Sequence, residues 1–150
     1  MMNQAAEAYW NDYWKNKIKP KSVSAWQFGV EPDTLAQLVI DGIKTATCSG
    51  HIFYKLENEP LPTTEDYNII LNSDDKPVAI TKTIEVTITP MNKVSEEFAI
   101  AEGEGDRTYQ YWWDEHEKFF RKELNAIGRE FSEDMLLVCE RFKVIHVKDE

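Results

Sequence analysis

The sequence contains little cysteine, no long hydrophobic run and few basic residues relative to acidic ones. Its two cysteines, Cys48 and Cys139, are too few for a disulfide framework and form neither a CxxC pair nor a zinc motif. The first residues lack the basic start and apolar core of a signal peptide, and no apolar run approaches the roughly 20 residues that span a bilayer. We therefore expect a cytoplasmic protein that has two buried free thiols and requires no metal or other cofactor.

The deficit of basic residues narrows the range of partners. Lys and Arg number 17 against 27 Asp and Glu, which gives a formal net charge of −10. A long nucleic-acid groove or an anionic membrane surface needs clustered basic side chains, whereas the one basic cluster, residues 15–21, is expected to be a solvated helix end. A single nucleoside, nucleotide or short RNA remains a reasonable ligand, held in a cleft through its base and sugar.

The 150 residues suffice for one domain with a proper hydrophobic core. The apolar spacing and the capping signals, among them Asn3 before the first helix and Ser95 before the third, predict helices over four segments, namely 4–17, 31–42, 95–102 and 108–127. Alternating or β-branched runs predict strands over 24–30, 43–49, 66–71, 77–89 and 135–147. This order predicts an α+β domain with a mostly antiparallel, barrel-like sheet.

The strand predicted at 77–89 has the clearest pattern in the chain. The short connection from 66–71 predicts that these two strands form a hairpin. Strict alternation would place Val78, Ile80, Ile84, Val86 and Ile88 together on one face, and the threonines and Glu85 on the other.

A lysine follows the second predicted helix in the run Gly42-Ile43-Lys44-Thr45-Ala46-Thr47. Lys44 is either a solvated cation that favours the negative end of the helix, or a side chain in a partly dry pocket. In the second case its pKa falls and it can act as a base. The spacing alone leaves both interpretations open.

An acidic, glycine-containing turn, Glu102-Gly103-Glu104-Gly105-Asp106, follows the short helix. The ordered ligand spacing of an EF-hand is missing. The turn is either a solvated loop or a means of projecting Glu102 into a pocket, as a general acid or as an acceptor for a base edge.

Aromatic residues of the long helix form a stripe that includes Trp112, Trp113 and His116. Such stripes are more often core than binding surface, and Trp26 has the same two interpretations. The alternative is a surface on which a base stacks.

These motifs together resemble the ASCH domain family. The matching pieces are Gly-x-Lys-x-x-Thr at 42–47, the run 76–80, the segment 98–106 and Trp113-x-x-His116-x-x-x-Phe120. The resemblance covers most of the chain, so we expect an ASCH domain over 24–150 and an N-terminal helical extension over 1–23. It implies a PUA-like β-barrel flanked by helices, with a cleft at the barrel mouth and RNA-related or nucleoside-related roles.

One branch of the family removes an acetyl group from N4-acetylcytidine, and some other members are reported as ribonucleases. The resemblance to that amidohydrolase branch implies that Lys44 is the proton acceptor, Thr47 the nucleophile and Glu102 the proton donor. Further residues around the same cleft are expected to bind the ligand: Trp26, Thr45, Ser49, Glu104, Asp106, Trp113 and His116.

Three hypotheses follow for the function. The first is a hydrolase that acts on a modified nucleoside, nucleotide or short RNA. The second is a non-catalytic module in which the same cleft binds RNA or a nucleotide. The third is an interaction protein whose exposed aromatic residues form a homo-oligomer.

Overall fold

The computed structural model describes residues 2–148 and contains one five-stranded sheet in the order β1-β3-β4-β5-β2. The strands are β1 Val23–Trp26, β2 Ala46–Gly50, β3 Tyr67–Leu71, β4 Pro77–Pro90 and β5 Leu136–Val147. The α-helices are α1 Gln4–Trp14, α2 Pro32–Ile40, α3 His51–Leu56, α4 Glu96–Glu102 and α5 Tyr109–Ala126, and a 3₁₀ turn η1 spans Met91–Lys93. The mixed α+β class is as predicted. β1 pairs parallel with β3 and the other pairings are antiparallel.

The prediction of a barrel is wrong, because the sheet is open. β1 and β2 are its two edges, and they flank opposite halves of the long β4–β5 ribbon. β1 lies beyond β3, which pairs with residues 77–82 of β4. β2 pairs with residues 137–141 of β5, opposite residues 85–89 of β4. Two short edge strands that are offset in this way do not meet, so the sheet does not close.

The predicted faces of β4 are also wrong. Thr81 and Thr83 are buried, whereas Ile84 and Ile88 are 50% and 42% exposed. The pairing with β5 shifts register between Ile80 and Thr81, and again between Thr83 and Glu85. The first irregularity adds Ile145 to β5, whereas the second adds Ile84 to β4. The extra residue changes the face of the β4 side chains beyond it, which simple alternation does not anticipate.

Other elements agree with the prediction more closely. β3 and β4 form the expected hairpin. α1 begins at the predicted cap, since the Asn3 side chain accepts a hydrogen bond from the Ala6 N–H, but it ends at Trp14 and leaves the lysine cluster outside. Helix α3 was not predicted, and β2 begins at Ala46, so Lys44 lies in the loop before it.

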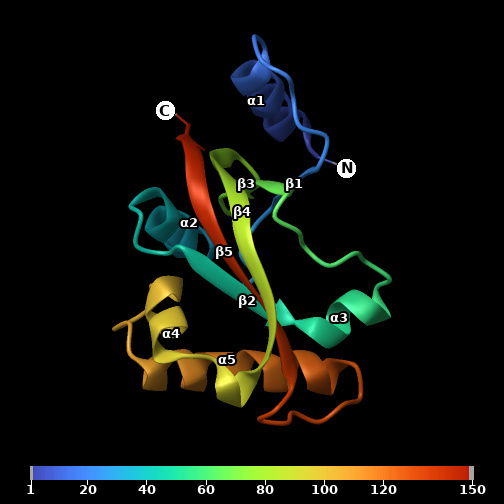
Figure 1. Cartoon of the computed structure of the whole chain (residues 1–150), viewed down its shortest axis with the longest axis vertical. Helices are drawn as coiled ribbons and strands as arrows, with labels where there is room; N and C mark the ends of the chain where they lie inside the picture. The colour runs from blue at the N-terminus through green and yellow to red at the C-terminus, as the bar shows by residue number, and fades with distance from the viewer. Residues whose placement is uncertain (1, 149–150) are drawn as a thin grey trace.

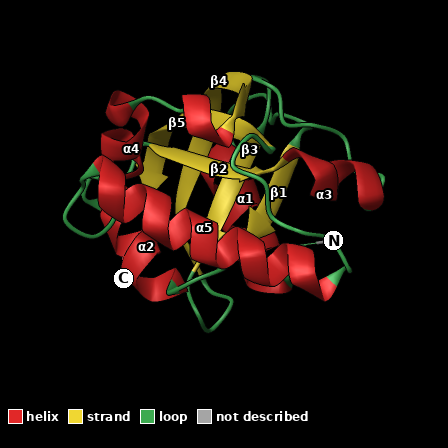
Figure 2. Ribbon diagram, turned by 90° about the horizontal axis from the view of Figure 1, so that it is seen from below, coloured by secondary structure: helices red, strands yellow, loops and turns green. Residues whose placement is uncertain are grey.

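Helices lie at both ends of the molecule (Figure 1), and α2 packs against the sheet between them. Figure 1 shows α1 at one end of the molecule and α5 at the other, and Figure 2 shows α5 crossing the strands. Tyr9 and Trp10 of α1 share a core cluster with Ile69 and Ile80, so α1 belongs to the packed structure. None of the helices within residues 2–148 is long and apolar enough to cross a membrane.

A second core cluster positions the candidate site. Phe98 of α4, with Trp112 and Phe120 of α5, packs against Ala46 and Leu137 of the β2–β5 pair. This packing holds the end of α4 and the middle of α5 over the start of β2, where the three elements meet.

Candidate functional site

The side chain of Lys44 is buried, with 1% of its surface exposed. Gly42 has a φ of +74°, which ends α2, and the N–H groups of Ile43 and Lys44 both donate to the Leu38 carbonyl. The Thr45 N–H then donates to Ala101 of α4 at 2.7 Å. The loop is therefore tied to both neighbouring helices, and this directs the lysine inward.

Glu102 is the last residue of α4 and is equally buried. The chain leaves the helix through Gly103, whose φ is +71°. A Cβ atom at this glycine would lie 2.6 Å from the Ile43 carbonyl oxygen. Because only glycine tolerates both the φ and the close approach, the sequence at the turn fixes how α4 meets the Lys44 loop.

The Lys44 amine has four acceptors within hydrogen-bond distance. Nζ lies 2.9 Å from the Ala46 carbonyl oxygen, 3.2 Å from the Glu102 carbonyl oxygen and 3.1 Å from Glu102 Oε1. The fourth acceptor is Glu104 Oε2, at 2.8 Å. An ammonium group has three protons to donate, so its hydrogen-bonding capacity is fully used.

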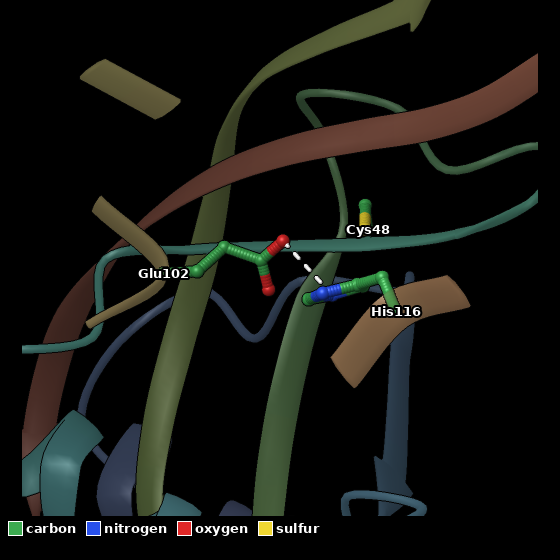
Figure 3. A group of neighbouring side chains, drawn as sticks. All are labelled: Cys48, Glu102 and His116. Atoms are coloured by element: carbon green, nitrogen blue, oxygen red, sulfur yellow. Dashed lines mark ion pairs between the residues drawn. The ribbon is translucent and has the colours of Figure 1, made fainter. Parts of the chain in front are cut away.

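The second oxygen of Glu102 faces α5. Trp112 Nε1 donates to Glu102 Oε2 at 2.6 Å, and His116 Nε2 lies 3.4 Å from the same atom. Figure 3 shows the imidazole directed at the carboxylate, with the Cys48 sulfur nearby. The His116 ring stacks on the Trp112 indole with 4.5 Å between centroids. The carboxylate therefore joins the Lys44 loop to the long helix.

The charged forms of Lys44, Glu102 and His116 stabilise one another. Burial favours a neutral lysine, but Glu102 and Glu104 outweigh it and raise the pKa of Lys44. Burial likewise disfavours the Glu102 carboxylate, but Lys44 and His116 hold its pKa well below the usual range. The Glu102 charge also outweighs burial at His116 and raises the pKa of that ring. In the resting state Lys44 is thus an ammonium and Glu102 a carboxylate.

These residues line a cleft with a volume of about 410 Å³. Lys44, Thr47 and Glu102 all face it, together with Glu104 and His116. Its apolar wall includes Phe28, Leu35, Tyr111, Phe119 and Phe120. A polar floor under an aromatic wall is an arrangement typical of small-molecule sites.

A larger cavity, of about 1220 Å³, adjoins the cleft and shares Thr47 with it. Hydrogen bonds link neighbouring strands of the sheet from Trp26 to Asn68, from Asn68 to Thr83 and from Thr83 to Glu140, and Trp26, Asn68 and Glu140 line this cavity. Burial raises the pKa of Glu140 to about 7. Glu140 lies directly opposite Thr47 in the β2–β5 register.

The predicted site residues fall into three groups. Lys44, Thr47, Glu102, Glu104 and His116 meet at the smaller cleft, whereas Trp26 and Ser49 line the larger cavity. The other three line neither of these two cavities. The Thr45 hydroxyl donates to the Ala101 carbonyl, Asp106 accepts from Thr108, and the Trp113 indole donates to Glu117.

Sequence reasoning missed several residues that line these cavities. Cys48 was predicted to be a buried thiol. It is a free cysteine as expected, but it is half-buried and lines the cleft. Phe28 lies under the Lys44 amine, 5.5 Å from the ring centroid. Glu140 had no local signal, because only the pairing of β5 with β2 brings it beside Thr47.

The fold and the site define an α+β protein of the PUA-like type with a buried Lys–Glu cluster at its cleft. The ASCH domain family model matches residues 24–146, and the chain belongs to this family. It is similar to an ASCH domain from Lactobacillus crispatus JV V101, with 34% identity over 95% of each chain and a TM-score of 0.90. It is also similar to protein EF3133 from Enterococcus faecalis V583, with 41% identity over 96% of this chain and 90% of the other, and a TM-score of 0.85. No curated protein matches the chain.

Proposed function

We propose that the protein is a hydrolase that acts on a modified nucleoside, nucleotide or short RNA in the cleft lined by Lys44, Thr47 and Glu102. The observation that carries the proposal is the convergence of these residues on one cavity from a loop, a strand and the end of a helix. The Thr47 hydroxyl becomes a nucleophile when a neighbouring base takes its proton. The rings of Phe28 and Tyr111 on the cleft wall suit a flat base.

The proposed roles need a neutral amine at Lys44 and a protonated carboxyl group at Glu102, whereas the resting state has an ammonium and a carboxylate. The two states differ only in the position of one proton. Lys44 Nζ and Glu102 Oε1 are 3.1 Å apart, so a proton can pass from the ammonium to the carboxylate. The products are a neutral amine that accepts a proton and a carboxylic acid that donates one. The transfer becomes more favourable when one of the two anions beside the ammonium moves away, because Glu102 and Glu104 together hold its proton.

Glu104 is the partner that must leave Lys44 for this transfer. Its side chain is 25% exposed, and it lies on a turn between Gly103 and Gly105, which both have positive φ values. An oxygen atom of the substrate can take its place 2.8 Å from Nζ. Removal of this carboxylate leaves the ammonium with one ionic partner in place of two.

For an amide substrate, Thr47 Oγ1 attacks the carbonyl carbon and its proton passes to Lys44 Nζ. The C–N bond breaks as Glu102 protonates the leaving amine, which leaves an ester on Thr47. A water molecule then attacks the ester and gives a proton to Glu102, while Lys44 returns a proton to Thr47 Oγ1 as the C–O bond breaks. The acid product departs, and both side chains regain the protonation with which the step began.

The test compares Thr47→Val with Thr47→Ser and wild type on a panel of N4-acetylcytidine, nucleoside monophosphates and a short single-stranded RNA. The Thr47 hydroxyl makes no hydrogen bond within residues 2–148, so Thr47→Val should fold normally. We expect at least about 1,000-fold lower turnover in Thr47→Val and partial retention in Thr47→Ser, measured by chromatography of the products. Full activity in Thr47→Val, or no hydrolysis of any compound by wild type, would contradict the proposal.

A non-catalytic nucleotide- or RNA-binding module is the second candidate. The resting charges favour it, because Lys44 has no free donor and Glu102 is ionised. Calorimetric titration of the same compounds separates the two functions. Binding without product formation supports the module, whereas binding with turnover supports the hydrolase.

A further inference from the structure

We propose that Cys48, Glu102 and His116 form a binding site for a zinc ion. The three residues come from β2, the end of α4 and the middle of α5. Each offers one ligand atom, and these atoms lie within 4.8 Å of one another (Figure 3). The proposal goes beyond the hydrolase function, which shares Glu102 with this site but uses neither Cys48 nor His116.

The separations suit a tetrahedral ion. Zinc binds nitrogen and oxygen at about 2.0–2.1 Å and sulfur at about 2.3 Å, so ligand atoms of one tetrahedron are about 3.3–3.6 Å apart. His116 Nε2 and Glu102 Oε2 already lie 3.4 Å apart. The widest pair therefore needs to close by no more than about 1.5 Å, which a rotation of the short Cys48 side chain can supply.

Trp112 orients both of the ligands on the helical side. Its carbonyl oxygen lies 2.7 Å from His116 Nδ1, and because a carbonyl can only accept, Nδ1 carries the proton. Nε2 is therefore the nitrogen that is directed towards Glu102. The indole N–H of Trp112 donates to Glu102 Oε2. Metal ligands in proteins are commonly held by such outer contacts, which fix the histidine tautomer and the direction of the carboxylate.

The surrounding charges accommodate a divalent cation. Burial and the charge of Glu102 raise the pKa of the Cys48 thiol, so the ion would displace the thiol proton on binding. The resulting thiolate and the carboxylate of Glu102 then balance the two charges of the ion. The ammonium of Lys44 contacts the other oxygen, Glu102 Oε1, and keeps Glu104 as its own counter-ion at 2.8 Å. No unpaired charge is left in the buried cluster.

All three ligands line the 410 Å³ cleft, so the fourth position of the ion would face the cavity. Three protein ligands with an open fourth position are typical of catalytic rather than structural zinc sites. The mixed sulfur, nitrogen and oxygen set favours Zn²⁺ over the harder Mg²⁺ and Ca²⁺. Such an ion polarises a carbonyl group or activates a water molecule.

The test measures zinc binding directly on the full-length, metal-free protein, without substrate. Calorimetric titration with zinc chloride should give one ion per chain, and titration with Co²⁺ should give a thiolate-to-cobalt absorption band. We expect Cys48→Ser and His116→Gln each to weaken zinc binding by at least about 100-fold. Because no turnover is read, failure of the hydrolase proposal does not affect the result.

Cys139→Ser is the matched control. Cys139 is the other thiol, lies directly opposite Cys48 in the β2–β5 register, and is not among the three proposed ligands. It should keep both the zinc affinity and the cobalt band. The proposal is overturned if wild type gives no cobalt–thiolate band, or if zinc affinity survives in both ligand variants. It is also overturned if the band disappears in Cys139→Ser and remains in Cys48→Ser. Should a ligand variant fail to fold, the cobalt spectra of wild type and Cys139→Ser still decide.

Discussion

Replacement of Glu140 by glutamine should stabilise the protein at neutral and alkaline pH and leave its stability unchanged at acid pH. Burial raises the pKa of Glu140 from 4.5 to about 7, a hydrogen bond from Thr83 lowers it in part, and the charge of Asp66 raises it further. Thr83 Oγ1 lies 3.4 Å from Glu140 Oε1, so the carboxylate gains little in return for the water that it loses. Glutamine fills nearly the same volume without a charge.

The direction of this pH dependence follows from how tightly the folded and unfolded states bind the Glu140 proton. The folded protein holds the Glu140 proton more tightly than the unfolded chain does, because the folded pKa is the higher one. The stability contributed by this group is therefore fully present below pH 4.5 and is lost as the pH rises through about 7. At about 1.4 kcal/mol per pKa unit, the loss approaches about 3 kcal/mol above that range.

Urea unfolding of wild type and Glu140→Gln from about pH 4 to about pH 8.5 measures the difference in the free energy of unfolding. We expect no difference at the acid end and a gain that approaches about 3 kcal/mol for the variant at the alkaline end. Glu130→Gln, at an exposed position after α5, should show no such trend. A difference that stays constant with pH, or a variant that is less stable at pH 8, would refute the reasoning.

Two further predictions concern the cluster itself. Gly103→Ala should lower the free energy of unfolding by at least about 2 kcal/mol, because φ is +71° and the new Cβ would lie 2.6 Å from the Ile43 oxygen. Gly128→Ala, with a φ of +75° and nothing within 4 Å, should lower it by only about 1 kcal/mol, and equal losses in urea unfolding would exclude the close approach as the cause. Lys44→Met should destabilise the protein by about 3–5 kcal/mol, because it leaves Glu102 buried without its cation. Addition of Glu102→Gln should restore part of that loss, and a double variant no more stable than Lys44→Met would contradict the ion-pair argument.

Local signals predicted the elements that depend on neighbouring residues. Asn3 and Ser95 cap their helices as the sequence indicates, each through a side chain that accepts from an N–H three residues later. The β3–β4 hairpin likewise follows from two adjacent runs and a short turn. These features need no information from distant parts of the chain.

The faces of β4 and the closure of the sheet were mispredicted for a shared reason. Alternation assumes an unbroken register, but the irregularities at Ile80/Thr81 and Thr83/Glu85 arise from pairing with β5, whose partner residues lie about sixty positions later in the sequence. Closure depends in the same way on where two short edge strands pair along the central ribbon.

For the candidate site, the sequence alone was enough to single out three candidate residues: the lysine after α2, the threonine three positions later and the glutamate before a glycine turn. The surroundings of these residues depend on the tertiary structure. In the folded protein Lys44 is buried between Glu102 and Glu104. Glu140 lies opposite Thr47, and Cys48 lies close to Glu102 and His116. Capping and turn formation act over a few residues of one segment. These contacts instead join segments from 50 to more than 90 residues apart, and only strand register and the packing of α4 and α5 on the sheet set their distances.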